Sequence, residues 1–190
     1  MTLKLVLPLL ALIAISSAAF VTAPVQPAIA SSIRTIPTPT KKSAVKTIAE
    51  ITFVEGEFDG VVIARSEAEW KKLLSPNAYY VLRKEGTERA YTGALTDNKK
   101  KGTYYCAACG LALFSSAAKY DSETGWPSFF EPIFKKNVTE KADNLLSEER
   151  IEVECARCGS HLGHVFDDGP EPTGLRYCMN SVALKFKESK

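Results

Sequence analysis

The chain has 190 residues, of which 45% are apolar, 24 are basic and 22 are acidic. This composition excludes an intrinsically disordered chain and fits one globular domain with an extension. The charge is uneven, because residues 1–49 hold five basic side chains and no acid, which leaves residues 50–190 with 19 basic and 22 acidic groups and a balance of −3. A mildly acidic body lacks the clustered basic surface that general nucleic-acid binding needs.

Residues 1–49 are predicted to be a targeting presequence that begins with a signal peptide of about residues 1–19. A lysine precedes the apolar run at 5–15, and four small residues follow it, which is typical of a secretory signal peptide. The run is shorter than the roughly 20 apolar residues of a membrane span. A single N-terminal anchor remains the alternative, because Phe20 and Val21 extend the apolar stretch.

A transit-like segment follows the predicted signal peptide. Residues 23–46 are rich in Ser, Thr, Pro, Ala and Lys and contain no acid, which is typical of a transit peptide. The junction at residues 18–24 resembles the Ala-Phe-Ala-Pro cleavage motif of bipartite plastid presequences in algae with secondary plastids. We therefore expect import into such a plastid, with the secretory pathway or secretion as the alternative.

Two short helices are predicted at the start of the folded domain, which we expect to span residues 66–190 after a linker at 50–65. Ser66 and Glu69 form a capping box, and an apolar face follows at Trp70, Leu73 and Leu74. A second helix opens at the Ser-Pro step of residues 75–76, and Gly86 is placed to end it.

The rest of the domain is predicted to be mainly β. Strands are expected at residues 103–106, 151–155 and 175–186, separated by turns rich in Gly, Pro, Asp and Asn. The order along the chain is therefore two small helices followed by strands.

Four of the five cysteines form two C-x-x-C pairs, each followed by a glycine. The pairs are Cys106 with Cys109 and Cys155 with Cys158, with 45 residues between them. Two such knuckles suit a tetrahedral zinc ion, and four protein ligands predict a structural role because no position is left for substrate. The alternatives are two disulfides or a thioredoxin-like redox pair.

The fifth cysteine, Cys178, is the candidate nucleophile. On a strand, Arg176, Cys178 and Asn180 share one face, while the intervening residues point the other way. The arginine favours the thiolate, and the asparagine supplies a hydrogen-bond donor for a polar substrate group. The alternative is an inert, buried cysteine.

Both histidines of the chain follow the second knuckle, at His161 and His164. The acids Asp167 and Asp168 come shortly afterwards and could orient an imidazole. The alternatives are extra metal ligands or two structural histidines. Trp126 either occupies a core turn or walls a pocket for a small apolar group such as a methyl.

Together these features resemble the B-type methionine sulfoxide reductases. The resemblance runs from about Ser66 to Phe186. It rests on the motifs at residues 79–83, 86–88, 102–106, 121–129, 155–170 and 173–180. It implies reduction of the R epimer of methionine sulfoxide in proteins, as repair of oxidative damage. It also implies two antiparallel sheets with a zinc ion bound far from the catalytic cysteine.

The resemblance also implies roles for individual residues. Cys178 would attack the sulfoxide sulfur, and His164, with His161 nearby, would donate the proton to the sulfoxide oxygen. Arg176 and Asp168 would hold that network. Attack would leave a sulfenic acid on the cysteine, so an external thiol must restore the enzyme.

Three further residues complete the implied site: Asn180 would assist the network, Trp126 would pack the substrate methyl, and Phe166 would line the pocket. One departure from the family is Thr124, which stands where many members carry a resolving cysteine. We therefore expect the one-cysteine subtype, a monomer reduced by thioredoxin, glutaredoxin or glutathione.

Two rival functions remain at this point. A zinc-stabilised β module that binds nucleic acid or protein is supported by the three lysines at residues 99–101, although such a run is usually a solvated turn. The second rival is a secreted domain held by disulfides. The acidic body disfavours nucleic acid, which we do not expect as a partner.

Overall fold

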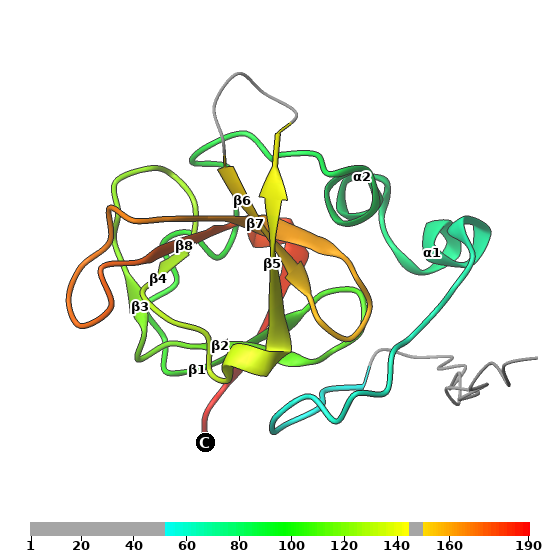
Figure 1. Cartoon of the computed structure of the whole chain (residues 1–190), viewed down its shortest axis with the longest axis horizontal. Helices are drawn as coiled ribbons and strands as arrows, with labels where there is room; N and C mark the ends of the chain where they lie inside the picture. Colours follow the sequence, from blue (N-terminus) through cyan, green and yellow to red (C-terminus); the bar gives the residue numbers. More distant parts are fainter. Residues whose placement is uncertain (1–51, 145–149) are drawn as a thin grey trace, which may run out of the picture. The chain divides into compact units, whose positions relative to one another are not determined.

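The computed structural model describes residues 52–144 and 150–190, so the predicted presequence lies outside the described residues. Within them the chain is mainly β, with two short helices before the first strand, as predicted (Figure 1). The elements are α1 (Glu67–Leu73), α2 (Pro76–Lys84), β1 (Gly102–Cys106), β2 (Ala112–Ser115), β3 (Lys119–Tyr120), β4 (Ser128–Phe129), a 3-10 turn (Lys135–Asn137), β5 (Val138–Asp143), β6 (Arg150–Cys155), β7 (His161–Phe166), β8 (Arg176–Met179), a second 3-10 turn (Ser181–Ala183) and β9 (Leu184–Glu188).

Both helices begin at the predicted caps. In the capping box of α1, the Ser66 hydroxyl accepts a hydrogen bond from the Glu69 amide at 3.3 Å, and the Glu69 carboxylate accepts one from the Ser66 amide at 2.8 Å. The Ser75 hydroxyl caps α2 by accepting from the Ala78 amide at 3.2 Å. These bonds satisfy amides that a helix leaves unpaired. No helix in residues 52–144 and 150–190 is long and apolar enough to cross a membrane.

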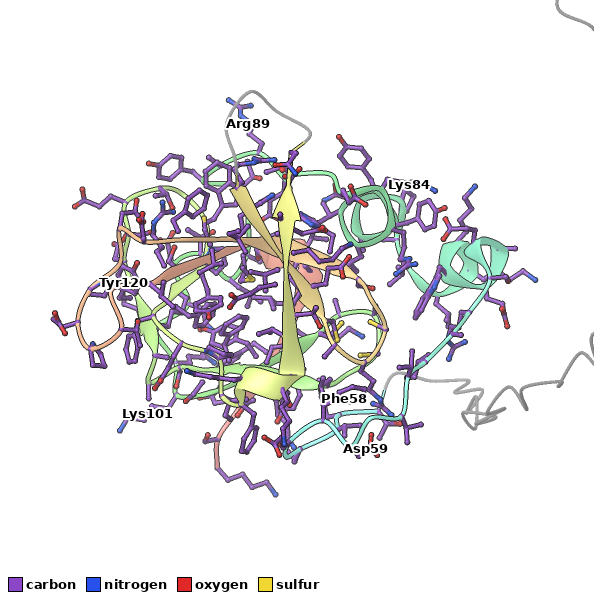
Figure 2. The ribbon with its side chains drawn as sticks, in the orientation of Figure 1. Phe58, Asp59, Lys84, Arg89, Lys101 and Tyr120 are labelled. Carbon is purple, nitrogen blue, oxygen red and sulfur yellow. The ribbon has the colours of Figure 1, made fainter. Side chains whose placement is uncertain are left out.

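The predicted role of Gly86 as the residue that ends α2 is wrong. The helix ends at Lys84 (Figure 2), and Glu85 takes the left-handed conformation with φ of 53°. Gly86 meets a different constraint, because a Cβ atom there would lie 2.3 Å from the Tyr80 ring. The glycine allows the chain to pass close under that ring.

The strands form two antiparallel sheets, as predicted. The smaller sheet has the order β2-β1-β9, and the larger has the order β3-β4-β8-β7-β6-β5. Helix α2 packs beside β7. The strands predicted at residues 103–106 and 151–155 correspond to β1 and β6, each of which begins one residue earlier.

The single strand predicted at residues 175–186 is wrong, because it is two strands in different sheets. β8 ends at Met179, the chain turns through Ser181–Ala183, and β9 begins at Leu184. The carboxylate of Glu88, distant in the sequence, accepts hydrogen bonds from two amides of this turn. The sequence pattern of residues 175–186 therefore does not reveal the turn at Ser181–Ala183, because a residue distant in the sequence, Glu88, stabilises it.

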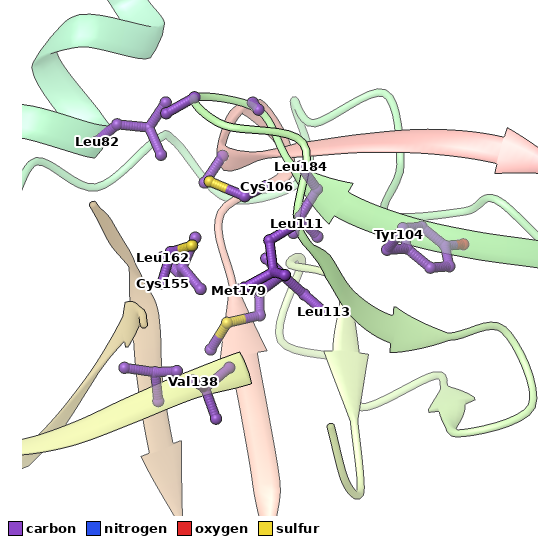
Figure 3. Packing of buried hydrophobic residues seen from close by; sticks show 14 of the residues in the cluster. Leu82, Tyr104, Cys106, Leu111, Leu113, Val138, Cys155, Leu162, Met179 and Leu184 are labelled. Atoms are coloured by element: carbon purple, nitrogen blue, oxygen red, sulfur yellow. The ribbon is translucent and has the colours of Figure 1, made fainter. Parts of the chain in front are cut away.

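An aromatic cluster joins the two sheets across the core. Phe114 of β2 stacks on Phe129 of β4 with ring centres 4.5 Å apart, and it lies 5.8 Å from the ring of Tyr177 in β8. The Tyr104 ring of β1 meets Phe129 edge-on at 5.0 Å. In Figure 3 the side chain of Met179 in β8 lies among the leucines of the same core. The face of the larger sheet that carries Tyr177 therefore packs in the hydrophobic core.

Residues 52–65, predicted to be a linker, have extensive contacts with the domain. Val54 forms a β-bridge with Leu111. Ile63 is buried, and its amide donates a hydrogen bond to the Arg157 carbonyl at 2.7 Å. The packed unit therefore begins before the first helix.

Buried Asn137 ties this segment to the sheets, and its loss should destabilise the fold. Its Oδ1 atom accepts from the Phe58 amide at 2.7 Å, and its Nδ2 atom donates to the carbonyls of Gly56 at 3.0 Å and Ala112 at 2.7 Å. We expect Asn137→Ala to lower the free energy of unfolding by about 2–4 kcal/mol, because three backbone groups lose their partners. Urea denaturation measures this. The exposed control Asn77→Ala should change it by less than about 0.5 kcal/mol, and equal effects would contradict the assignment.

Candidate active site and metal centre

Cys178 lies within the six-stranded sheet, directly opposite His164. The register pairs His164 of β7 with Cys178 of β8, and the neighbouring ladders pair His164 with Glu152 and Cys178 with Ser128. Directly opposite residues of antiparallel strands project from the same face. One row across four strands therefore carries a carboxylate, an imidazole, a thiol and a hydroxyl on one side of the sheet.

A β-bulge places both histidines on this face. In a regular strand, residues three apart, such as His161 and His164, point to opposite faces. The ladder between β6 and β7 shifts register between Val153 and Glu154, which adds one residue on the β7 side. As a result the two imidazole rings lie 5.3 Å apart, edge to face.

A cavity of about 120 Å³ opens onto this row of side chains. Strands β6, β7 and β8 and the loops around them line this cavity, at Thr87, Trp126, Arg150, Gly163, His164, Phe166, Cys178, Met179 and Asn180. The structure thus brings together five of the predicted site residues. The Trp126 indole is fixed in place by a hydrogen bond from its Nε1 atom to the Glu88 carbonyl at 3.1 Å.

Each imidazole is hydrogen-bonded to a carboxylate. His161 Nδ1 lies 2.7 Å from Glu152 Oε1, and His164 Nε2 lies 3.0 Å from Asp143 Oδ2. A carboxylate only accepts, so each of these ring nitrogens carries the proton. The opposite nitrogen of His161, Nε2, is buried and has no hydrogen-bond partner among the described residues.

Burial controls the protonation of His164. It lowers the pKa of the imidazole below its ordinary value, and the hydrogen bond to Asp143 only partly offsets this. The positive charge of Arg150, which bonds the same carboxylate at 2.6 Å, lowers this pKa further. His164 is therefore mostly neutral at neutral pH, with Nε2 protonated and the other ring nitrogen able to bind a proton.

The expectation that Asp167 or Asp168 orients an imidazole is wrong. The carboxylates that contact the rings are Glu152 of β6 and Asp143 of β5. Neither carboxylate was predicted, although alternation along the predicted strand at 151–155 puts Glu152 on the opposite face from the buried valine beside it. Nothing in the local pattern indicated Asp143, which depends on how β5 pairs.

Arg176 is paired with Asp168. Its Nε and Nη2 atoms donate to the two oxygens of Asp168 at 2.7 and 2.8 Å. The guanidinium also lies over the Phe166 ring, 4.4 Å from its centre. The predicted alternation on this strand is confirmed, since Tyr177 and Met179 are buried on the core side while Arg176 is partly exposed.

The environment of Cys178 does not favour the thiolate as the sequence analysis expected. Burial raises the pKa of the thiol, and this outweighs the opposing effects of Thr124 and of the Arg176 charge. Arg176 is also ion-paired with Asp168, which weakens the effect of its charge on the pKa of Cys178. Thr124 Oγ1 lies 3.9 Å from Cys178 Sγ, so the residue at the resolving position faces the thiol.

Asn180 is buried at the edge of the cavity and is bonded on two sides. Its Oδ1 atom accepts from the Glu88 amide at 2.9 Å, and its Nδ2 atom donates to the Leu162 carbonyl at 3.1 Å. It therefore joins β7 and the loop that carries Glu88 at the cavity wall.

The four paired cysteines converge on one buried point. Their sulfur atoms all lie within 4.8 Å of one another, with 3.7 Å between Cys106 and Cys158 and 3.5 Å between Cys109 and Cys155. Tetrahedral zinc with bonds of about 2.3 Å requires sulfur atoms roughly 3.8 Å apart. The four residues therefore fit a tetrahedral metal ion.

The metal site joins the two sheets and shares no residue with the cavity. One knuckle follows β1 of the smaller sheet, and the other follows β6 of the larger. Arg83 of α2 donates to the Cys158 carbonyl at 3.2 Å, and Arg157 donates to the Cys109 carbonyl at 3.3 Å. These bonds hold the turns that present the sulfur atoms.

The features that supported the rival functions have ordinary roles. All five cysteines are free thiols, so the disulfide alternative is not observed. Within the lysine triplet, Lys100 pairs with Glu188 at 2.8 Å on the surface. An exposed pair of this kind is typical of a solvated turn.

Comparison with known proteins shows which family the chain resembles. The SelR domain family matches residues 74–188. Peptide methionine sulfoxide reductase MsrB of Methanosarcina barkeri is 59% identical over 125 residues, which cover 66% of this chain and 88% of that protein. The MsrB of Leptospira interrogans is 55% identical over 126 residues, which cover 66% of this chain and 96% of that protein. Peptide methionine sulfoxide reductase B1, chloroplastic, of Arabidopsis thaliana is 55% identical over 121 residues, which cover 63% of this chain and 59% of that protein.

The family match extends from the second helix to the last strand and spans both knuckles, both histidines and Cys178. It leaves residues 1–73, which include the first helix, unmatched. The chain therefore belongs to the SelR-domain family of B-type peptide methionine sulfoxide reductases.

Proposed function

We propose that this protein reduces the R epimer of methionine sulfoxide in oxidised proteins to methionine, as a repair of oxidative damage. The proposal rests on one observation, the position of Cys178 opposite His164 at a small cavity that Trp126 borders. A thiol nucleophile beside a proton donor is the minimum that this reaction needs. The printed names of the relatives support the same reaction class.

The cavity accounts for binding of the oxidised side chain. The faces of Trp126 and Phe166 offer apolar surface to the S-methyl group, and the Nε1 bond of Trp126 keeps its ring from rotating. The sulfoxide oxygen then points toward the histidine row. Because the Arg176–Asp168 pair holds the Phe166 ring from outside, these two residues position the pocket rather than touch the reacting atoms.

The chemical step transfers one oxygen atom from sulfur to sulfur. The Cys178 thiolate attacks the sulfoxide sulfur while a proton reaches the sulfoxide oxygen, which makes the substrate sulfur electrophilic. The unprotonated ring nitrogen of His164 takes the proton from the Cys178 thiol, which leaves the attacking thiolate, and His164 then donates this proton to the sulfoxide oxygen. His161 lies beside His164, and Asn180 lies at the cavity wall. Transfer of the hydroxyl to Cys178 breaks the substrate S–O bond. The products are methionine and a cysteine sulfenic acid, so the substrate sulfur is reduced by two electrons and Cys178 is oxidised by two.

An external thiol completes the cycle. The four other cysteines are grouped at the metal site, and Thr124 faces the reactive sulfur, so the chain offers no second thiol there. Thioredoxin, glutaredoxin or glutathione reduces the sulfenic acid, releasing water and the oxidised reductant. The protein acts as a monomer in this scheme.

We propose a structural zinc ion at Cys106, Cys109, Cys155 and Cys158. The support is the sulfur spacing and the burial of all four residues. Four thiolate ligands leave no open position for substrate, so the ion contributes folding energy and takes no part in the chemistry.

We also propose that residues 1–49 carry the chain to a plastid, with residues 66–190 as the reductase domain and residues 50–65 joining the two. The acid-free composition of the first segment supports this route. The relative from Arabidopsis thaliana, which is named chloroplastic, is in keeping with a plastid form of the family.

Removal of the nucleophile should separate catalysis from folding. We expect Cys178→Ser to abolish sulfoxide reduction and to leave metal content and circular dichroism unchanged, because a hydroxyl is too weak a nucleophile. His164→Ala should lower kcat by about 10²–10⁴-fold if it supplies the proton. The assay is chromatography of R and S sulfoxide peptides with dithiothreitol, and exposed Asp167→Asn is the control with wild-type rates. Turnover by Cys178→Ser would contradict the mechanism, and equal reduction of both epimers would contradict the stereochemistry.

The fate of the oxidised cysteine tests the one-cysteine cycle. After one turnover without reductant, dimedone should label Cys178, and mass spectrometry should detect the adduct. Thr124→Cys should replace this label by an internal disulfide, because Thr124 Oγ1 lies 3.9 Å from Cys178 Sγ. Ser189→Cys, a thiol near the C-terminus, should keep the dimedone adduct. A wild-type disulfide between Cys178 and any paired cysteine would rule the proposed cycle out.

Metal analysis tests the zinc proposal. Purified residues 50–190 should contain about one zinc per chain, and Cys155→Ser should lower the unfolding temperature as well as the metal content. Cys178→Ser is the matched control, since it removes a thiol outside the cluster. A metal-free protein with wild-type stability would disprove a structural ion.

A further inference from the structure

A second cavity lies on the other side of Trp126. It has a volume of about 220 Å³, and we call it the acidic cleft. Trp126 lines both this cleft and the cavity above Cys178. The side chains that shape the cleft besides Trp126 are Tyr91, Tyr120, Asp97, Asp121 and Glu123. The two cavities share Trp126 as a wall. When the methionine sulfoxide of a polypeptide enters the cavity above Cys178, the residues next to it in that polypeptide therefore lie beside the acidic cleft.

Tyr91 forms a rigid, exposed aromatic surface at this cleft. The residue is 73% exposed, the highest value among the exposed large hydrophobic residues that the structure describes. It is nevertheless held at both ends, because its amide donates to the Gly125 carbonyl at 2.8 Å and its hydroxyl donates to the Glu123 carbonyl at 2.6 Å. A fixed, exposed tyrosine is typical of a binding surface, since little conformational entropy is lost when a partner covers it.

The backbone at Tyr91 has an uncommon conformation in this arrangement. Tyr91 has a φ of 64°, an uncommon conformation for a bulky residue. Gly125 has a φ of 89°, and a Cβ atom there would lie 2.8 Å from the Tyr91 amide nitrogen. The position of the exposed ring is therefore fixed by the loop that also carries Trp126.

The cleft has a negative charge that nothing in its walls neutralises. Asp97, Asp121 and Glu123 are exposed, and none of them forms an ion pair within residues 52–144 and 150–190. No lysine or arginine lines the cleft. The adjoining hollow shares Asp97 and Asp121 with the cleft and is lined by Lys99, Lys100 and Lys119. Lys119 is partly buried, donates to the Thr96 carbonyl at 2.6 Å and offsets part of the charge of the two aspartates.

We propose that the acidic cleft binds a lysine or arginine side chain next to the methionine sulfoxide of a substrate polypeptide. The proposal rests on the proposed sulfoxide reduction and specifies the sequence context that the same site prefers. The cationic group lies against the faces of Tyr91 and Trp126 and pairs with the surrounding carboxylates. A flanking glutamate meets like charges instead, so the cleft both attracts one class of substrate and repels another.

Matched peptides test the preference. We compare peptides in which lysine, alanine or glutamate flanks methionine sulfoxide on both sides. KM should be about 3–10-fold lower for the lysine peptide than for the glutamate peptide with kcat nearly unchanged, because exposed charge pairs and a cation–π contact together give effects of this size. The difference should largely vanish at about 1 M salt, where the Debye length is about 3 Å.

Two triple variants test whether the cleft causes the preference for lysine peptides. The triple variant Asp97→Asn, Asp121→Asn and Glu123→Gln should remove the difference between peptides, while an N-acetylated, amidated methionine sulfoxide without neighbours is reduced at the wild-type rate. The control with an equal loss of charge elsewhere changes exposed Asp59→Asn, Glu131→Gln and Glu171→Gln, and it should keep the preference.

The aromatic part of the cleft needs its own variant. Tyr91→Asn suits the left-handed backbone but lacks the ring, so it should raise KM for the lysine peptide about 2–5-fold and leave the small sulfoxide unaffected. Equal KM values for all peptides, or equal loss of preference in the control triple variant, would overturn the proposal.

A separate readout distinguishes this proposal from the proposed reaction. Absence of any sulfoxide reduction would reject the reaction alone. Calorimetric binding of the corresponding methionine peptides then tests the cleft directly: tighter binding of the lysine peptide that the cleft triple variant abolishes supports it, and equal binding of the lysine and glutamate peptides overturns it.

Discussion

The close pairing of β7 with β8 is the constraint on which the rest of the site depends. It sets the His164 imidazole and the Cys178 thiol side by side on one face, while Tyr177 and Met179 on the other face fill the core. The two strands approach closely because Gly163 lacks a side chain: a Cβ atom there would lie 2.1 Å from the Cys178 carbonyl oxygen. Any larger residue must push the strands apart, which would separate the His164 imidazole from the Cys178 thiol.

A single buried residue then fixes the walls of the cavity to this strand pair. The Glu88 carboxylate accepts from the amides of Ser181 and Val182, where the chain leaves β8. The backbone of Glu88 donates to Asn180 and accepts from the Trp126 indole. A buried carboxylate is stable here because amides compensate its charge. The loop that carries Trp126 is thereby positioned relative to Cys178 without belonging to the sheet, and the same loop presents its other side to the acidic cleft.

Features set by residues close in sequence could be predicted, and those set by strand pairing could not. The capping box at Ser66, the two knuckles and the side on which Cys178 lies follow from spacings of four residues or fewer. By contrast, the carboxylates at the imidazoles, Asp143 and Glu152, belong to strands whose partners are chosen by the whole sheet. The bulge that brings His161 to the same face and the turn after β8 also depend on distant contacts. Strand alternation did not predict the bulge, and it wrongly predicted one strand where the turn lies.

The four-cysteine cluster and the sheet face that carries both histidines are joined by one hairpin. Cys155 is the last residue of β6 and His161 the first of β7, and the Cys155 amide donates to the Ser160 carbonyl at 2.9 Å within the turn between them. A metal ion that holds Cys155 and Cys158 fixes the conformation of this turn. Turn geometry sets the register of the strands that it joins. An ion bound there would therefore support, through the backbone, the bulged pairing that turns the His161 ring toward His164, although no residue of the four-cysteine cluster lines the cavity.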